Sequence, residues 1–405
     1  MRSPLICTAL FALHTLATPS WTSTPFNPAA IPLTVRSPYL STWLPQGEGV
    51  ALNDAWPTHW AGKVAAWTGF VSVDGQQYKF LGGAGVGDVP FTTATQKSFN
   101  FTSTQSIFVL SAGPVDLTVT FLSPVETDLV KLSIPLAYMD VSFSSTDGKT
   151  HDVKVYSDIT GEWLTGDDSW DLQWETTTKG IVSHEISFQY PAMWQEVNDH
   201  IAYASATLVL CASFNSISDG SLYYSTLPGK GVMYQTGPDV FVRGNFLSNS
   251  SLPNTKDTLF RATSDAWPVF ALAKDFGKVK TGSVVFSIGH IRDPAVEYVL
   301  PNGKMQSRSL YFWSKFSTAA AVVSRALPRC IDAVPGKPIG QPPTPAHPVE
   351  GIRRIIQPQG LKYILLDERP KRGFGGEQER GEGRQDTVHH VRVLEHRAEG
   401  RGGLE

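Results

Sequence analysis

The sequence predicts a mainly β protein, a large antiparallel β-sandwich that ends in one helix and a disordered tail. Three observations support this fold class. Only 18% of the 405 residues are charged whereas 11% are aromatic, and aromatic residues favour strands. Short segments of alternating polarity end at Gly, Pro, Asn or Asp, which favours antiparallel strands joined by turns over a parallel α/β sheet. All 11 tryptophans lie between Trp21 and Trp313, while charged residues concentrate after Gly351, so only the earlier region has the composition of a packed core.

Individual strands are predicted from alternation with a period of two. Residues 116–121 alternate leucine, valine and phenylalanine with threonine, as expected of a half-buried strand. Asp74-Gly75 lies between two such segments and predicts a tight hairpin. Further strands are predicted at residues 153–156, 184–190, 206–212 and 283–288.

The end of the chain differs from this pattern. Apolar residues at steps of three and four from Leu310 to Leu327 predict a helix, which Pro328 should end. Residues 328–348 are rich in proline and have the character of a linker. From Phe374 onward Gly, Glu, Arg and Gln dominate, which is typical of disorder. The predicted organisation is a signal peptide at 1–17, a Pro/Ser/Thr-rich segment at 18–28, a β domain at 29–327 and a linker with a disordered tail at 328–405.

The N-terminus resembles a secretory signal peptide. Arg2 precedes the mostly apolar residues 5–16, and Ala17 is a small residue at the expected cleavage point. The alternative, a buried N-terminal helix or strand, fits the following Pro, Ser and Thr residues less well. We therefore expect a secreted, extracellular protein with candidate glycosylation sites at Asn100 and Asn249. No other run of 18 apolar residues occurs, so we expect no membrane partner.

Familiar chemical motifs do not occur. The net charge of −3 gives no reason to expect nucleic acid as a partner. Three cysteines form neither a disulfide framework nor a metal cluster. Residues 82–87 look like a nucleotide-binding loop, but Asp88 replaces its third glycine and no helix pattern follows, so a flexible turn is expected. We predict neither a metal nor a cofactor.

Two segments are candidates for a ligand site. Residues 161–175 interleave carboxylates with indoles, a combination that can hold a sugar because carboxylates accept hydroxyl hydrogen bonds and indoles stack on ring faces. The alternative is a solvated loop at a strand end with its tryptophans in the core, and this alternative is favoured. The acid candidates are Glu162, Asp167, Asp168 and Asp171.

The second candidate segment lies near the N-terminus. It combines polar groups with three indoles, which suits a ligand groove, but equally suits an edge strand whose aromatic residues pack on the sandwich. The spacing leaves both interpretations open. Its candidate ligand-binding or cleft-rim residues are Arg36, Tyr39, Trp43, Trp56, His59 and Trp60.

Several long, ordered motifs carry a family resemblance. They are Val35–Pro45, Trp56–Trp60, Val73–Tyr78, Asp158–Trp163 and Ile288–Tyr298. Together they resemble the N-terminal β domain of the fungal-type glutaminase A family, over residues 26–327. Residues 308–313 look like the start of the helix that connects the two domains of that family.

The resemblance implies a secreted amidohydrolase that converts L-glutamine to L-glutamate and ammonia. It also implies a supersandwich-like β domain packed against a helical toroid that holds the active cleft. Residues 328–405 are too few for about twelve helices of about 11 residues each. We therefore expect that the helical domain is missing, through a faulty gene model or truncation, that the chain is inactive, and that its catalytic residues cannot be identified.

Two further hypotheses stay open beside the glutaminase resemblance. The chain could be a secreted module that binds a carbohydrate through either candidate segment, or a docking domain without catalysis. A groove lined by Trp43, Trp56, His59 and Trp60 would favour binding. An exposed apolar face along residues 310–327 would favour docking.

Overall fold

A computed structural model describes residues 21–37, 40–46, 49–60, 62–87, 89–164, 167–190, 194–197, 200–204 and 220–330. For residues 194–197, 200–204, 296–299 and 328–330 the description covers the backbone alone. The chain divides into two compact units, residues 1–342 and 343–405, and all described residues belong to the first. The predicted signal peptide, the strand at 206–212, Tyr39 and the predicted tail from residue 331 therefore lie outside the described residues.

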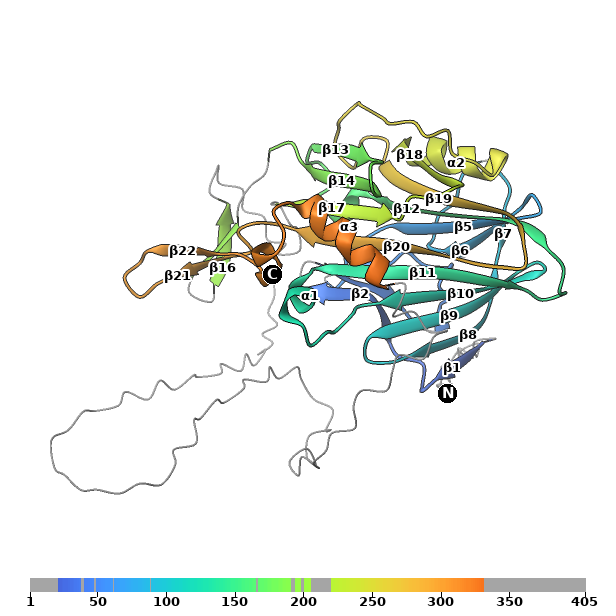
Figure 1. Cartoon of the computed structure of the whole chain (residues 1–405), viewed down its shortest axis with the longest axis horizontal. Helices are drawn as coiled ribbons and strands as arrows, with labels where there is room; N and C mark the ends of the chain where they lie inside the picture. Colours follow the sequence, from blue (N-terminus) through green and yellow to red (C-terminus); the bar gives the residue numbers. More distant parts are fainter. Residues whose placement is uncertain are drawn as a thin grey trace, which may run out of the picture. The chain divides into compact units, whose positions relative to one another are not determined.

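Two large sheets form the predicted sandwich (Figure 1). The first has nine strands in the order β1 (Thr22–Thr24), β8 (Thr95–Phe101), β9 (Gln105–Ala112), β10 (Val115–Leu122), β11 (Leu136–Ser145), β20 (Thr281–Ile291), β17 (Ser221–Thr226), β14 (Val182–Phe188) and β13 (Leu172–Thr177). The second has six, in the order β18 (Val232–Pro238), β19 (Pro268–Val279), β12 (His151–Thr160), β5 (Trp67–Val73), β6 (Gln76–Leu81) and β7 (Thr92–Thr93). Within these sheets the described pairings are antiparallel except β1 with β8 and β6 with β7. The mainly β, antiparallel fold class is thus confirmed.

Smaller sheets complete the described strands. Three strands, β2 (Ala30–Ser37), β3 (Leu40–Pro45) and β4 (Thr58–His59), form one sheet whose apolar residues join the central core. Two hairpins pair β15 (Trp194–Val197) with β16 (His200–Ala204) and β21 (Val296–Val299) with β22 (Met305–Arg308).

The core lies between the two large sheets, where period-two alternation directs one side chain in two inward. Leu117, Val119 and Phe121 of β10 are buried, as the sequence predicts. From the facing sheet, the ring of Trp67 meets that of Phe121 edge-on, with centroids 5.3 Å apart. The predicted hairpin is also present, because Asp74 and Gly75 adopt φ values of 51° and 85° between β5 and β6.

Helices cover the outer faces of both sheets. Helix α2 (Asp239–Asn249) lies on the six-stranded sheet, where Val242 and Phe246 pack with Phe70 and Tyr156. Helix α3 (Ala319–Cys330) lies on the nine-stranded sheet, where Val322 and Leu327 belong to a buried cluster with strand residues such as Leu136. A short helix, α1 (Leu129–Ser133), joins the same cluster through Val130. None of the helices in the described part of the chain has the length and apolar character that a membrane crossing requires.

The predicted single helix from Leu310 to Leu327 is wrong in its continuity and its end. A 3₁₀ helix, η3 (Tyr311–Ser314), stops at Lys315, and α3 begins anew behind Thr318, whose hydroxyl accepts from the Ala321 amide at 3.2 Å. This side-chain cap starts a second helix, whereas periodicity alone predicts a single continuous helix. The helix extends past Pro328 to Cys330. Its apolar stripe is covered by the sheet and does not form the exposed face that would have favoured docking.

Candidate functional site

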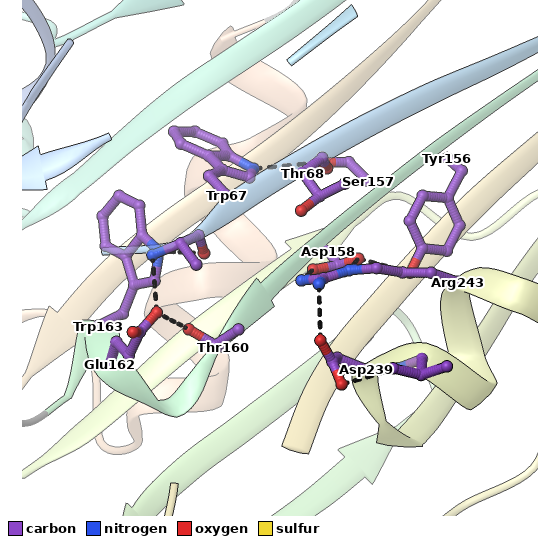
Figure 2. A network of polar contacts seen from close by, with 12 residues as sticks. Trp67, Thr68, Tyr156, Ser157, Asp158, Thr160, Glu162, Trp163, Asp239 and Arg243 are labelled. Atoms are coloured by element: carbon purple, nitrogen blue, oxygen red, sulfur yellow. Dashed lines mark hydrogen bonds and ion pairs between the residues drawn. The ribbon is translucent and has the colours of Figure 1, made fainter. Parts of the chain in front are cut away.

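The best-defined polar centre lies near the C-terminal end of β12, between the sheet and α2 (Figure 2). Asp158 and Arg243 are 0% and 3% exposed. The guanidinium donates to both carboxylate oxygens, from Nε to Oδ2 at 2.9 Å and from Nη2 to Oδ1 at 2.8 Å. Its Nη1 donates to Asp239 Oδ2 at 3.0 Å, and the Tyr156 hydroxyl donates to Asp158 Oδ2 at 2.6 Å. The centre therefore ties α2 to the middle of the six-stranded sheet.

Electrostatics keep this centre charged and closed. Burial alone would lower the pKa of Arg243, but the adjacent carboxylates, Asp158 first, raise the pKa above its usual value. Burial, followed by the charge of Asp158, raises the pKa of Tyr156, which therefore remains a hydrogen-bond donor. The Trp56 ring lies 5.7 Å from the guanidinium carbon and covers it further. An ion pair this deeply buried is suited to holding α2 against the sheet and offers neither Asp158 nor Arg243 to solvent.

Glu162 lies four residues after Asp158, in the 3₁₀ helix η2 (Gly161–Trp163). Its Oε2 accepts hydrogen bonds from the Ala66 amide at 3.2 Å and from the Thr160 hydroxyl at 2.8 Å. Burial raises the pKa of Glu162, although both hydrogen bonds oppose this shift. Glu162 is therefore a half-buried carboxyl whose pKa lies above its usual value.

Gly161, between these two features, cannot be replaced without movement. A Cβ there would lie 2.4 Å from Leu172 Cδ1 and 2.5 Å from Thr263 Oγ1. This close approach explains a glycine between Asp158 and Glu162 in the Asp158–Trp163 motif.

The other acid candidates lie nearby but in different environments. Burial raises the pKa of Asp168, and the charge of Asp168 contributes to the raised pKa of Glu162. The Ser169 side chain, which donates to Asp167 at 2.6 Å, lowers the pKa of Asp167. The backbone of Asp171 forms an isolated bridge with Ala262. Of these three acids, Asp168 is the one whose charge acts on Glu162.

The indoles of the same segment are not available as sugar platforms. Trp163 is 6% exposed and donates to the Ala66 carbonyl at 2.9 Å. Trp174 is 7% exposed and donates to the Asp257 carbonyl at 2.8 Å. Trp170 is half-buried against Phe188. These contacts fit the alternative in which the tryptophans belong to the core.

Arg36, from the N-terminal candidate segment, donates hydrogen bonds to backbone carbonyls at the C-terminal end of α1. Its Nε donates to the Ile134 carbonyl at 3.1 Å and its Nη2 to that of Lys131 at 3.4 Å, with a further bond to the Leu132 carbonyl. These carbonyls lie at the C-terminal end of α1, where a helix has carbonyls without a full set of intrahelical partners, and the Lys131 carbonyl also accepts from the Ile134 amide at 3.2 Å. Burial lowers the pKa of Arg36. The arginine therefore holds α1 in place.

The remaining N-terminal candidates do not face one groove. Trp43 pairs with Thr58 and His59 with Thr42 across β3 and β4, so Trp43 and His59 point to opposite faces of that sheet. Trp56 packs under Arg243 on the outer face of the six-stranded sheet, whereas Arg36 holds α1, which packs on the nine-stranded sheet. Trp60 is 59% exposed, with its ring 5.7 Å from that of His59. Tyr39 lies outside the described residues.

Sequence reasoning missed the Asp158–Arg243 centre. The i,i+4 spacing of Asp239 and Arg243 could have indicated an ion pair on a helix. The principal partner, however, lies 85 residues away along the chain, and no local pattern reports that distance.

The candidate glycosylation sites lie outside the two candidate segments. Asn100 and Asn249 are exposed, and their glycosylation stays a prediction. Within the residues that the structure describes, no group of three or more His, Cys, Asp or Glu side chains is arranged to hold a metal.

The fold and this centre define a large β-sandwich domain with a helix fastened to it by a buried ion pair. Residues 104–332 match the family model described as "Domain of unknown function (DUF5127)", and the chain belongs to this family. Two curated relatives carry the word glutaminase in their names. Glutaminase A of Aspergillus oryzae is 38% identical over 328 residues, which are 78% of this chain and 44% of the relative. A probable glutaminase of Arthroderma benhamiae is 27% identical over 316 residues, 70% of this chain and 34% of the relative.

These matches confirm the resemblance to the glutaminase A family, and the chain spans less than half the length of either relative. Solved structures give weaker likenesses. Heparan sulfate lyase HepC of Pedobacter heparinus is 9% identical, with a TM-score of 0.28 over 63% of this chain and 39% of that one. A putative kojibiose phosphorylase from the human microbiome is 10% identical, with a TM-score of 0.29 over 70% of this chain and 28% of that one. TM-scores this low support no conclusion about fold or function.

Proposed function

We propose that this chain is the β domain of a secreted, glutaminase-like amidohydrolase and that it supports a catalytic domain without hydrolysing glutamine itself. The observation that carries the proposal is the 38% identity to a protein named Glutaminase A, over most of this chain but only 44% of that protein. The sandwich then corresponds to one part of a larger enzyme.

The chemistry of the described residues favours a supporting role. Amide hydrolysis needs an activated nucleophile, a proton donor for the leaving ammonia and donors for the oxyanion. Asp158 and Arg243 are sealed against α2 and reach no substrate. His184 is fully buried between Thr176 and the Ala271 carbonyl, and burial lowers its pKa to about 4, so it is neutral and inaccessible. Glu162 supplies at most one of the required groups.

A carbohydrate-binding role has less support. Trp43 and His59 face opposite sides of their sheet, and Trp56 is covered by Arg243. The groove that would have favoured such a role is therefore not assembled by these residues.

The test is ammonia release from L-glutamine by the purified chain, beside Glutaminase A of Aspergillus oryzae as the positive control. We expect no turnover above that of a heat-denatured sample of the chain. Turnover comparable to the control would contradict the supporting role and would move the search for catalytic groups to Glu162, Asp167, Asp168 and His59. In that event Glu162→Gln, compared with Glu175→Gln on β13, would show whether the half-buried carboxyl of Glu162 takes part in the hydrolysis.

A further inference from the structure

A cavity of about 280 Å³ lies on the outer face of the nine-stranded sheet. Strand β11 contributes Leu136 and Tyr138 to its lining, and α1 contributes Val130. Phe316 and Ala326 come from the segment around α3. The cavity contains none of the candidate residues discussed above, and its apolar lining is suited to a hydrocarbon group.

Charged side chains also line the cavity, and they are not equally engaged. Glu126 lies 3.5 Å from the Lys131 ammonium, and Asp128 accepts from the Lys131 amide at 3.0 Å. Glu126 therefore has a cation close by, whereas the bond of Asp128 is to a backbone amide and leaves its negative charge in place. Lys315 and Arg325, both exposed, form no ion pair with any residue that the structure describes. The side of the cavity formed by the α3 segment therefore presents two cations that have no ion-pair partner among the described residues.

We propose that this cavity binds a small amphipathic carboxylate. Its hydrocarbon part lies between α1 and β11, and its carboxylate meets Arg325 and Lys315. An arginine fork matches a carboxylate in two parallel hydrogen bonds. The free-energy cost of desolvating the carboxylate is small because both cations are exposed, and burial of the hydrocarbon part is favourable.

The volume sets the size of the ligand. A cavity of about 150 Å³ is known to hold one benzene. The cavity here has a little under twice that space, which suits a saturated chain of about eight carbons. Octanoate is therefore the probe, and methyl octanoate and hexanoate are the matched probes for charge and length.

The experiment titrates octanoate into the full chain by calorimetry. We expect one site per chain and binding at least tenfold weaker for methyl octanoate, which lacks the charge. Each methylene that is buried should strengthen binding about fourfold, so hexanoate should bind more than tenfold more weakly than octanoate. No heat with octanoate at two well-separated temperatures, many weak sites, or equal binding of the ester would overturn the proposal.

Substitutions locate the site. Arg325→Glu should weaken octanoate at least tenfold, and Lys315→Glu should weaken it in the same direction, since each replaces a cation with an anion. Arg308→Glu is the matched control, because Arg308 is an exposed arginine on β22 outside the cavity lining. All three changes are at exposed positions, and thermal melts establish that each variant is folded. Equal affinity of folded Arg325→Glu and Arg308→Glu would place the ligand elsewhere and overturn the assignment.

Discussion

Arg243 on α2 and Asp158 on β12 form a two-point ion pair that is closed to solvent, with N–O distances of 2.9 and 2.8 Å. The pair links a helix and a strand that lie far apart in the sequence. Because a second carboxylate and a tyrosine hydroxyl complete its hydrogen bonds, neither charge is left uncompensated in the protein interior.

The first prediction removes one member of this pair. Asp158→Asn should destabilise the protein by about 3–5 kcal/mol, because it leaves the buried Arg243 charge without its main partner. Urea unfolding of the variant and the wild type measures the difference. The control is Asp116→Asn, which breaks the largely exposed pair with Lys97 and should cost at most about 1 kcal/mol. Similar losses for both variants would show that the buried pair holds α2 no more firmly than a surface pair does.

The second prediction concerns pH and Asp140, on β11. Burial raises the pKa of Asp140 to about 6, and the Ser283 hydroxyl that donates to it only partly opposes this shift. Because the unfolded state loses this proton near pH 4 and the folded state near pH 6, the contribution of Asp140 to stability falls as pH rises between these values.

Asp140→Asn should therefore be more stable than the wild type by about 1–3 kcal/mol at pH 7 and equal to it below about pH 4. Denaturation at several pH values measures this difference. The asparagine oxygen can still accept from Ser283, so that contact is retained. A difference that does not change with pH would mean that Asp140 ionises normally in the folded protein.

The third prediction concerns His151, whose ring bridges two hairpins. Its Nδ1 lies 2.6 Å from Asp74 and its Nε2 lies 3.0 Å from Asp147. The hydrogen bonds to Asp74 and then Asp147 raise the pKa of His151. We call these two contacts the His151 clasp. Its contribution to stability is fully present below the usual histidine pKa and is lost as pH rises through the raised value.

An NMR titration of the His151 ring should give a midpoint above about 6.5. Asp74→Asn and Asp147→Asn should each lower that midpoint, since each removes one negative partner. His184, buried and neutral, provides the internal comparison, because burial lowers its pKa to about 4. A His151 midpoint that neither substitution moves would rule out the clasp.

The fourth prediction tests the packing of β5 against β6. A Cβ at Gly69 would lie 2.4 Å from the ring of Phe80, which is fully buried. Gly69→Ala should destabilise by about 1–3 kcal/mol, because the ring cannot withdraw without disturbing the core. Gly85→Ala, where a Cβ meets no atom within 4 Å, should change stability by less than about 0.5 kcal/mol. Thermal and urea unfolding measure both, and a Gly69→Ala variant as stable as Gly85→Ala would contradict the packing described.

Several elements were predictable because their signal is local. Residues 116–121 alternate with the period of a strand, and the structure has β10 over Val115–Leu122. Asp74-Gly75 carries the residues that a tight hairpin requires, and both adopt positive φ. The end of the chain was harder. Periodicity from Leu310 onward could not report that Thr318 caps a separate helix, because a cap depends on one side-chain contact.

The candidate sites were less predictable than the strands. The acid-rich segment was found from its composition, yet its tryptophans are used by the core. The aromatic residues near the N-terminus were grouped by proximity in sequence, whereas strand alternation directs Trp43 and His59 to opposite faces. Both outcomes follow from contacts that spacing does not encode.

The sequence by itself determined the mainly antiparallel fold class and the family, because strand period, turn chemistry and ordered motifs are properties of neighbouring residues. Only the tertiary structure decided that Asp158 meets Arg243, that Arg36 holds α1, and that a cavity forms between α1 and α3. These arrangements depend on which strands pair and which faces the helices cover. Such long-range choices are set by the burial of whole surfaces, which no short stretch of sequence records.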